Sequence, residues 1–556
     1  MSFQVPISQV SASIGGLGRI DGLHYSNGVE QYCGIPYATL SKRWTRSVLK
    51  TSWENDYHDG TQLGNNCPRP RISGTDANPN NPFIPVPANP FFTRLPVSDE
   101  KTALIINIVV PESPNHSSDG EAKFPVMAWI HGGSLLYGSA NYGIYDAVNL
   151  VSHSVSIGLP VIVVSFNYRL GLGGFLAGSK VEEELKKDGF AGNGNFGFTD
   201  QKVAMDWVQK YISQFGGDPN NVIAFGQSAG AISIGHQLAA NDPMKFDRAI
   251  FMSGLGSTLS PLSLEEHEEL FSASCRYFSI DAQAPDALDQ LRKIDQQVLA
   301  DADNKIQGAI SGGGNPCLDG WFYAHDPRII SEAPSWLRSF AMGDMHDEGV
   351  IFIMSLMNDT YDTVRSTMME HIRDEKFVNT VFELYGITPK LSKHDFIDRV
   401  ANMGADAVFK IQNYKTALVN KRLQSENSIF KYHFDQQSHI KNVLQGKAYH
   451  GLDVVYLFRN LENKLSEEER KMSDEFASAW IRFAYALDPW QSAGATMWKV
   501  WGPNSKERVE TEEEDEPVRF YSRFKNVMEM GAGGLWEKYI IALNYVLVKK
   551  GNMRRI

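Results

Sequence analysis

A single segment near the middle of the chain restricts the possible folds more than any other. Residues 222–230 read Val-Ile-Ala-Phe-Gly-Gln-Ser-Ala-Gly, and residues rich in Ala, Ile and Ser follow them. The apolar run is typical of a buried strand, and the residues after it are typical of the start of a helix. A tight strand-to-helix turn needs glycine on both sides, because the backbone doubles back closely, and it exposes the serine oxygen at the helix N-terminus. The segment therefore predicts a strand, a sharp turn and a helix, with Ser228 as a nucleophile.

Short β-branched runs alternate with helix-length segments around this turn. Residues 104–110, 126–130 and 160–166 are interpreted as buried strands, and residues 200–215 as a helix. This alternation predicts an α/β fold, in which crossover helices cover both faces of a mostly parallel sheet. Ligand chemistry then belongs at the carboxyl ends of the strands.

Composition and charge exclude several classes of partner. The chain has 556 residues, of which 42% are hydrophobic and 21% charged, and its net charge is -12. These values are ordinary for a globular protein, and a negative net charge provides no overall basic field for nucleic acid or anionic lipid. The longest apolar segment, residues 539–548, contains Asn544 and is shorter than the ~18 residues that a membrane span requires. We expect a soluble protein without a membrane span or a nucleic acid partner.

The N-terminus and the cysteines predict where the protein works. Residues 1–15 have neither a basic start nor an apolar core of the kind found in secretory signals. The four cysteines, Cys33, Cys67, Cys275 and Cys317, form no Cys-x-x-Cys pair, so neither a zinc site nor a disulfide scaffold is indicated. We therefore expect a cytoplasmic protein with free thiols, no metal and no cofactor.

Two segments have a biased composition. Residues 67–98 contain eight prolines together with several Asn and Gly residues, which predicts a long surface loop that can act as a lid. Residues 510–516 include six acidic side chains, and a run of this kind predicts a solvated loop.

A glycine-rich loop is predicted to support the nucleophile. Residues 127–130 resemble a strand that leads into His131-Gly132-Gly133-Ser134. An ester carbonyl attacked by Ser228 becomes an oxyanion, and fixed N–H donors stabilise such a charge strongly. We assign the N–H groups of Gly133, Ser134 and Ala229 to this oxyanion hole, and we interpret His131 as an anchor of the loop.

A serine nucleophile on this fold is followed along the chain first by an acid and then by a histidine. Residues 336–341 resemble a strand, and the polar loop of residues 343–349 after it contains both Asp347 and Glu348. Spacing alone leaves both carboxylates as candidates for the acid.

The base must also lie beyond Ser228. Residues 428–433 resemble a strand, and the loop after it carries His450, which Gly451 allows to approach closely. His450 is therefore the predicted base, with His439 and His433 as rivals. His433 lies in the middle of the predicted strand and is better explained as a structural histidine.

The order of several further motifs resembles a known family, the type-B carboxylesterases, which include cholinesterases, fungal lipases and intracellular carboxylesterases. The motifs are Gly-Ile-Pro-Tyr-Ala at 34–38, Asn-Tyr-Arg at 167–169, Gly-Asn through Asp-Gln at 194–201, Phe-Gly-Gly-Asp-Pro at 215–219 and the serine motif at 225–230. The resemblance implies an α/β-hydrolase fold with large helical insertions and the same oxyanion donors. It selects Glu348 over Asp347 as the acid, and it selects His450 as the base.

The resemblance covers nearly the whole chain, so one catalytic domain over residues 1–556 is expected, with the lid-like loop 67–98 inside it. Residues 131, 228 and 450 must converge on one site, which argues against a division into several domains.

Three departures from the family pattern are informative. Many members carry Ser-Glu-Asp-Cys where this chain has Glu100-Lys101-Thr102-Ala103, so the family's disulfide to Cys67 cannot form here. The glutamate of that tetrad usually pairs with the arginine matching Arg43, and Lys101 cannot do so. Ser134 replaces the third glycine of the oxyanion loop, where a Cβ atom adds crowding.

A further departure from the family pattern bears on the substrate. Gln227 stands where cholinesterases carry a glutamate, which removes a negative charge beside the nucleophile and weakens the case for cationic substrates. Loop 67–98 also lacks the tryptophan that binds choline in cholinesterases, although Phe83, Phe91 and Phe92 can either line an apolar entrance or simply pack.

These features together predict a serine carboxylic-ester hydrolase that acts on a small, neutral, fairly hydrophobic ester through an acyl-enzyme. An acyltransferase or tailoring enzyme of small-molecule biosynthesis, using the same acyl-enzyme, is the alternative. A non-catalytic cholinesterase-like binding module is a third possibility, because a fold alone does not fix function. The sequence assigns no substrate-binding residue.

Overall fold

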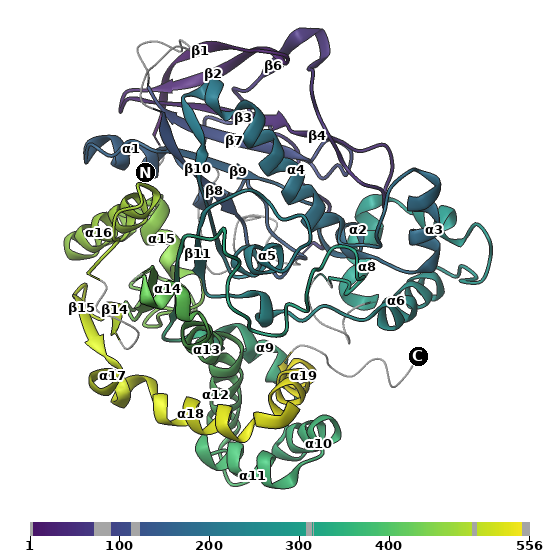
Figure 1. The fold of residues 1–556 in the computed structure, drawn as a ribbon, viewed down its shortest axis with the longest axis vertical. Helices are drawn as coiled ribbons and strands as arrows, with labels where there is room; N and C mark the ends of the chain where they lie inside the picture. The colour runs from purple at the N-terminus through teal and green to yellow at the C-terminus, as the bar shows by residue number, and fades with distance from the viewer. Residues whose placement is uncertain are drawn as a thin grey trace.

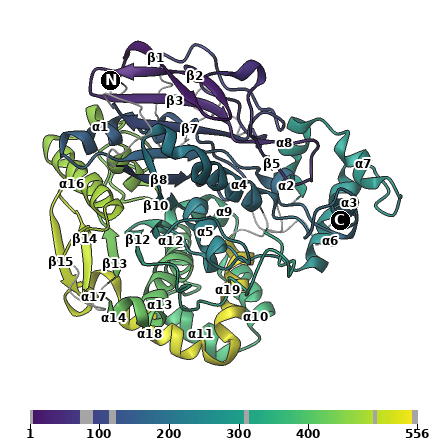
Figure 2. The same ribbon diagram turned by 45° about the horizontal axis from the view of Figure 1, so that its top comes forward.

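The structure, a computed structural model, describes residues 4–71, 90–112, 123–306, 314, 316–426, 428–491 and 497–547. Within these residues thirteen strands form one twisted sheet (Figures 1 and 2). Twelve of them follow one another across the sheet in the order β1 (Pro6–Ile14), β2 (Gly18–Tyr25), β3 (Val29–Pro36), β7 (Ile105–Pro111), β9 (Ile162–Phe166), β8 (Phe124–Ile130), β10 (Gly217–Gln227), β11 (Arg248–Met252), β12 (Ser339–Met345), β13 (Ile429–Phe434), β14 (Met497–Trp501) and β15 (Glu507–Thr511). The remaining strand, β6 (Tyr57–Asp59), pairs with β2, and β4 (Ala38–Thr39) pairs with β5 (Val48–Leu49) in a separate small sheet.

The centre of the sheet is parallel and its two edges are antiparallel. Strands β9, β8, β10, β11, β12, β13 and β14 pair in parallel, whereas β1, β2, β3 and β7 form an antiparallel edge and β15 closes the other edge. The predicted strands are present, and the mostly parallel α/β architecture is confirmed. The parallel strands end at a common edge, which is where polar loop residues can meet.

Alternating side chains of the central strands pack into two separate apolar cores, one on each face of the sheet. In β8, Val126, Ala128 and Ile130 face one core, whereas Met127 and Trp129 face the other, because successive side chains of a strand point to opposite faces. Helices α4 (Phe196–Tyr211) and α5 (Ala229–Leu238) cover the first face. Helices α1 (Val148–Ser156), α15 (Leu452–Phe458) and α16 (Glu467–Ala484) cover the second.

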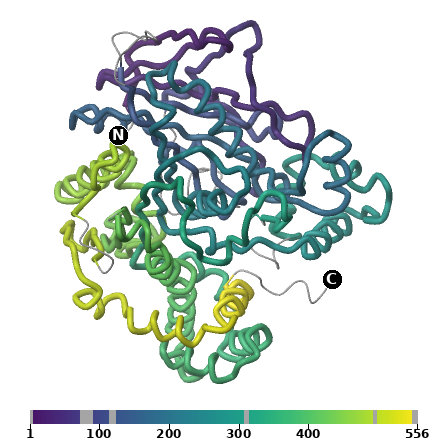
Figure 3. The backbone as a smooth tube through the Cα atoms, in the orientation of Figure 1, coloured from purple at the N-terminus to yellow at the C-terminus, as the bar shows by residue number. Residues whose placement is uncertain are grey.

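The remaining helices build two further apolar clusters beside the sheet. One cluster contains side chains of α9 (Ile353–Leu356), α10 (Tyr361–Ile372), α11 (Glu375–Leu384), α12 (Lys393–Ala405), α13 (Ile411–Val419), α18 (Tyr521–Met530) and α19 (Leu535–Leu547). The other contains side chains of α2 (Gly171–Phe175), α3 (Ser179–Lys187), α6 (Leu264–Tyr277), α7 (Ala287–Arg292) and α8 (Gln296–Ile306). Figure 3 shows the C-terminal segment, in yellow, returning to lie against the helices of residues 361–405, in green. The short helix α14 (Lys421–Ser425) leads into β13.

The acidic run at 510–516 is not the loop that its composition predicts. Its first members end β15, and the others begin α17 (Glu512–Arg519), which Thr511 caps by accepting a hydrogen bond from the backbone N–H of Glu514. The positive end of the helix dipole stabilises acidic side chains in the first turn. A run of like charges can therefore begin a helix when a capping residue precedes it.

The prediction for loop 67–98 is only partly addressed, because residues 72–89 lie outside the described residues. Residues 67–71 and 90–98 have no regular structure apart from an isolated bridge between Asn66 and Ser98.

The departure at Lys101 led us to expect that Arg43 lacks an acidic partner, but the structure provides one. Glu100, one position earlier, accepts its Nε–H at 2.6 Å. All four cysteines are buried and free.

Candidate active site

Ser228 occupies a strained turn between β10 and α5. Its backbone has a φ of 55° and a ψ of -126°, a combination that a residue other than glycine rarely adopts. The flanking glycines make the turn possible. A Cβ atom on Gly230 would lie 1.9 Å from the carbonyl oxygen of Ile130, and one on Gly226 would lie 2.6 Å from the carbonyl carbon of Gly230. Ser228 itself stays half-buried, at the positive end of α5.

The loop that follows β8 lies directly against this turn. A Cβ atom on Gly132 would approach the carbonyl oxygen of Gln227 to 2.6 Å and the Cβ of Ser228 to 3.1 Å. Gly133 and Ser134 both have positive φ, 112° and 57°. Among the described residues no acceptor takes the N–H groups of Gly133, Ser134 or Ala229. Three backbone donors predicted for the oxyanion hole therefore remain available beside Ser228.

His131 anchors the start of this loop. Its ring is buried, lies within hydrogen-bond distance of the carbonyl oxygen of Gly132 at 3.0 Å and stacks on Tyr168, with ring centroids 4.5 Å apart. The Tyr168 hydroxyl donates to the carbonyl oxygen of His131 at 2.9 Å. Burial lowers the pKa of His131 to about 4, so the ring stays neutral at physiological pH.

The structure separates the two candidate acids. Glu348 follows β12 and is completely buried, and its Oε1 accepts the backbone N–H of Met345 at 2.8 Å. Asp347 is partly exposed and accepts the backbone N–H of Ala448 at 2.8 Å, which ties the two loops together. Only Glu348 touches His450.

His450 lies between Glu348 and Gln227. Its Nδ1 is 2.5 Å from Oε2 of Glu348, and its Nε2 is 3.0 Å from the amide nitrogen of Gln227. Because an amide nitrogen only donates, Nε2 is the acceptor and Nδ1 carries the proton that Glu348 accepts. This is the tautomer that a general base needs, and it faces the residue next to Ser228.

The two rival histidines lie elsewhere. His433 is buried in β13, where its Nδ1 is 2.8 Å from Asp344 and its Nε2 is 2.8 Å from the hydroxyl of Tyr521. His439 is largely exposed, and its Nδ1 is 3.0 Å from Glu469. Among the described contacts, neither reaches the turn at Ser228.

A second buried carboxylate lies close to Glu348. Burial raises the pKa of Asp453 to about 7, and the negative charge of Glu348 adds to the shift. The Tyr432 hydroxyl donates to Asp453 Oδ2 at 3.1 Å. Asp453 is thus able to hold a proton near neutral pH, which limits the negative charge gathered around His450.

A cavity of about 240 Å³ opens in front of Ser228. Its polar and charged lining residues include Ser134, Glu266, Arg328, Asn544 and Tyr545. Most of the remaining wall is apolar and comes from Ile232, Leu259, Pro261, Leu262, Ile351, Phe352, Val408, Phe409, Ile541 and Leu547. The arrangement can accept an apolar molecule with one polar group placed near the serine.

Two contributors to this site escaped the sequence. Gln227 was recognised as a missing charge, but not as the partner of His450. Helix α19 supplies Ile541, Asn544, Tyr545 and Leu547 to the cavity, although it lies more than 300 positions from Ser228 in the chain. The amphipathic pattern of α19 predicts a helix with a buried face, but no local signal says what that face covers.

Among the described residues, no group of three or more His, Cys, Asp or Glu side chains is arranged to hold a metal ion. No helix within the described ranges is long and apolar enough to cross a membrane. Phe91 and Phe92 pack edge to face, with centroids 6.1 Å apart, beside the second core, and neither lines the cavity at Ser228. Phe83 lies outside the described residues.

A serine on a sharp strand-to-helix turn at the carboxyl edge of a mostly parallel sheet, together with a histidine that contacts the residue before the serine and a buried carboxylate, defines the class of α/β hydrolases. Comparison with known proteins agrees. A sequence profile of the carboxylesterase family matches residues 6–528, and the chain belongs to that family. It is accordingly a carboxylic-ester hydrolase that acts on small esters.

Individual relatives support membership of the family, and one of them is named as inactive. The chain is 29% identical to Lipase 3 of Yarrowia lipolytica over 486 residues, which cover 85% of this chain and 88% of the lipase. It is 25% identical to an inactive carboxylesterase-like protein of Byssochlamys spectabilis over 509 residues, 84% of this chain and 81% of that protein. A solved PNB esterase structure superposes with a TM-score of 0.71 at 25% identity, covering 92% of this chain and 99% of the esterase.

Proposed function

We propose that the chain hydrolyses neutral, fairly hydrophobic carboxylic esters through a Ser228–His450–Glu348 triad and an acyl-enzyme intermediate. One observation carries the proposal. His450 is held by Glu348 in the tautomer whose unprotonated Nε2 faces the segment containing Ser228. A base in that state is what a neutral serine hydroxyl requires.

The acylation step follows from this arrangement. Ser228 Oγ attacks the ester carbonyl carbon while His450 Nε2 takes the hydroxyl proton, and the amide of Gln227 must leave Nε2 for this to happen. The carbonyl oxygen becomes an oxyanion that accepts the N–H groups of Gly133, Ser134 and Ala229. His450 then gives its proton to the departing alcohol, and Glu348 stabilises the imidazolium that forms between the two transfers.

Deacylation repeats the sequence with water as the nucleophile. His450 takes a proton from the water as it attacks the acyl-serine carbonyl, and it returns that proton to Ser228 Oγ when the acid leaves. Removing one oxyanion donor costs about 10²- to 10³-fold in turnover in related chemistry, so the three backbone donors are a major part of the proposed rate enhancement.

The lining of the cavity supports the substrate class. Most of its side chains are aliphatic or aromatic, and Gln227 brings no charge to the base. A cationic alcohol group would therefore gain no ion pair from position 227. Apolar acyl or alcohol groups gain about 25 cal/mol for each Å² that they bury against such a wall.

A panel of 4-nitrophenyl esters of increasing acyl length, together with one choline ester, tests this function. We expect saturable hydrolysis of the neutral esters, weak activity on the choline ester, and covalent labelling of Ser228 by an organophosphonate. Ser228→Ala should abolish both activity and labelling, by analogy with losses of about 10⁶-fold in turnover on removal of a serine nucleophile. A Ser228→Ala variant with near-native turnover would refute the proposal.

The same panel with competing alcohols distinguishes hydrolysis from acyl transfer. Release of free acid that added alcohol does not divert supports a hydrolase, whereas ester formation that exceeds acid release at millimolar alcohol supports a transferase. The inactive relative makes a silent protein the third outcome, shown by no turnover and no labelling of Ser228.

We further propose that the chain works as one catalytic domain in the cytoplasm. The convergence of residues 131, 228 and 450 supports the first point. Four free cysteines are in keeping with the second, because thiols stay reduced there. Counting thiols in denaturant with a chromogenic reagent should give four, and two or none would contradict the location.

A further inference from the structure

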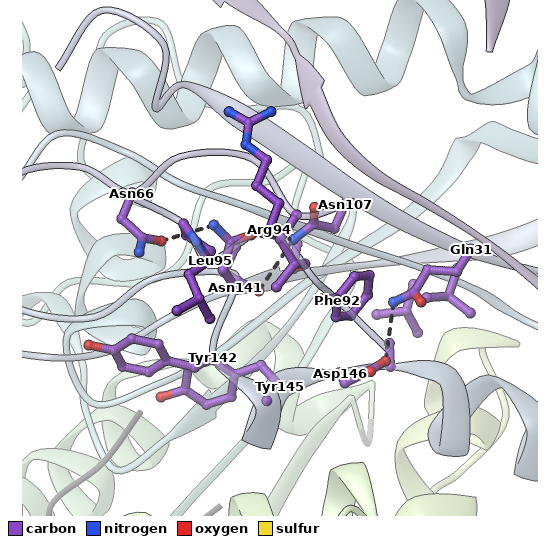
Figure 4. Close-up of a pocket in the computed structure, with 18 of the residues that line it drawn as sticks. Gln31, Asn66, Phe92, Arg94, Leu95, Asn107, Asn141, Tyr142, Tyr145 and Asp146 are labelled. Atoms are coloured by element: carbon purple, nitrogen blue, oxygen red, sulfur yellow. Dashed lines mark hydrogen bonds between the residues drawn. The ribbon is translucent and has the colours of Figure 1, made fainter. Parts of the chain in front are cut away.

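A second cavity, of about 220 Å³, lies on another part of the sheet (Figure 4). Side chains of β3, β7 and β9 form its floor, and residues from the segments 63–69 and 92–96 and from the loop 140–147 form its walls. None of its lining residues lines the cavity at Ser228. It is therefore a separate space, with its own chemistry.

Much of this cavity is apolar and aromatic. Leu63, Val109 and Val163 contribute aliphatic surface, and Phe92 adds a ring beside them. The rings of Tyr142 and Tyr145 are nearly parallel, with centroids 6.0 Å apart and an angle of 19° between their planes. Figure 4 shows both tyrosines on one side of the space, with Phe92 near the Gln31 and Asp146 end. Flat aromatic walls favour an occupant with a planar ring.

The amides of the cavity are already engaged with one another. Asn141 donates from Nδ2 to Asn66 Oδ1 at 2.9 Å, and Asn107 donates to Asn141 Oδ1 at 3.1 Å. At the other end Gln31 donates to Asp146 at 3.2 Å. These bonds, drawn as dashed lines in Figure 4, fix the shape of the cavity.

Arg69 is the exception, because its guanidinium lacks an acceptor. No described residue forms an ion pair or a hydrogen bond with this side chain, and Nη1 is buried without a partner. Its one recorded contact is with the ring of Tyr142, 5.3 Å from guanidinium to centroid. A half-buried cation with unmet donors is costly, and an anion removes that cost. Arg94 also lines the cavity, but it is exposed to solvent and weakly bonded to Asn65.

We propose that this cavity binds a small aromatic carboxylate, whose anionic group pairs with Arg69 and whose ring lies against Tyr142. The planar guanidinium can donate two parallel hydrogen bonds to a carboxylate, which is the geometry such a ligand offers. A cavity of about 220 Å³ limits the occupant to a small molecule such as a single-ring acid. The site is independent of the ester chemistry at Ser228.

Calorimetric titration of the full chain with benzoate and with benzamide, its neutral isostere, tests the proposal. We expect saturable binding of one benzoate per chain, and binding of benzamide weaker by about tenfold or more, because the charge-assisted bond to Arg69 is missing. Equal affinities for the two probes would overturn the proposal, and so would the absence of saturable benzoate binding.

Matched variants locate the binding. Arg69→Met keeps the apolar length of the side chain and should weaken benzoate to the level of benzamide. Arg328→Gln removes a cation from the cavity at Ser228 and should leave benzoate affinity unchanged. Loss of binding in Arg328→Gln, or wild-type affinity in Arg69→Met, would place the site elsewhere.

A crystal of the wild-type protein with benzoate keeps the test decisive if Arg69→Met does not fold. Benzoate bound between Arg69 and Tyr142 supports the proposal. Benzoate found only at Ser228, or nowhere at millimolar concentration, refutes it.

Discussion

Two histidine–carboxylate pairs lie at the same end of the sheet, and the ring of one of them, His450, packs against Phe409 in the wall of the cavity at Ser228. His450 contacts Glu348 at 2.5 Å, and His433 contacts Asp344 at 2.8 Å. Both acids come from β12 and the loop after it, and both are completely buried. By its contact with a buried carboxylate alone, either His450 or His433 could be the general base.

The second ring nitrogen makes the difference. His433 Nε2 is 2.8 Å from the Tyr521 hydroxyl, and its ring is stacked on Trp498 with centroids 4.2 Å apart. His450 Nε2 instead meets a side-chain amide that can move away, and its ring is still partly exposed. A carboxylate partner orients a histidine, but access to the other nitrogen decides whether it can transfer protons.

The largest effect that separates the two pairs is expected from His450→Ala. Turnover per folded molecule should fall by about 10⁵-fold or more, by analogy with other serine hydrolases that lose their base, and the unfolding midpoint should fall as well, because the buried Glu348 loses its partner. Steady-state kinetics on a 4-nitrophenyl ester and a urea unfolding curve measure both quantities. If His450→Ala stays active while His439→Ala is crippled, the assignment of the base is wrong.

Glu348→Gln should follow in size. The amide cannot stabilise the imidazolium and favours the wrong tautomer, so turnover should drop by about 10⁴-fold with KM nearly unchanged. Comparing kcat and KM separately checks this split. A variant that loses substrate binding and keeps kcat would show that Glu348 shapes the cavity instead.

His433→Ala is expected to act on stability. Removing the ring takes one buried partner from Asp344, which keeps Asn413 and Arg519, so the free energy of unfolding should fall by about 1 to 3 kcal/mol. Activity per folded molecule should stay within a few-fold of the wild type. His439→Ala is the matched control, since that ring is exposed and its ion pair contributes no more than about 1 kcal/mol. A large kinetic defect in His433→Ala with unchanged stability would reverse the comparison.

The acid dependence of stability probes the same buried pair. Burial alone would raise the pKa of Asp344, but His433, Arg519 and Lys410 oppose burial and lower it to about 2 from its ordinary 3.8. A depressed pKa stabilises the folded state above about pH 3.8, and the contribution disappears as pH falls through about 2. This contribution to the free energy of unfolding is about 2 kcal/mol. The stability difference between the wild type and Asp344→Asn, measured by urea unfolding, should narrow by that amount over this range, and a constant difference would contradict it.

The smallest effect is expected from Gln227→Glu. A carboxylate at this position favours the protonated form of the neighbouring base, so the acid limb of kcat/KM should move up by roughly one pH unit. Activity on the choline ester should rise relative to a neutral ester of equal size. Gln227→Met, which removes the amide and adds no charge, is the control and should leave the acid limb in place. An unshifted profile in Gln227→Glu would mean that the amide does not contact His450 in solution.

Local chemistry made most of the site predictable. Gly226 and Gly230 fix a turn whose geometry no other residues permit, so the strand, Ser228 and α5 follow from nine consecutive residues. Spacing alone left the acid open, because Asp347 and Glu348 are adjacent and both acidic, and only the family resemblance selected Glu348. Burial separates them, and burial depends on what packs over the loop. The acidic run at 510–516 misled us because its charge suggested a loop, whereas the cap at Thr511 makes it a helix start.

The sequence by itself determined the alternating strands and helices, the position of Ser228 and the order in which its partners follow. Each of these depends on the local sequence. Alternating side chains define the strands, and glycines on both sides of Ser228 define the tight turn. The family resemblance selected Glu348 and His450, and the structure brings them into contact. Only the tertiary structure decided that the amide of Gln227 contacts Nε2 of His450, that α19 lines the cavity at Ser228 and that Arg69 lines a second cavity. Those contacts join residues separated by 70 to more than 300 positions, and packing of the whole sheet sets them.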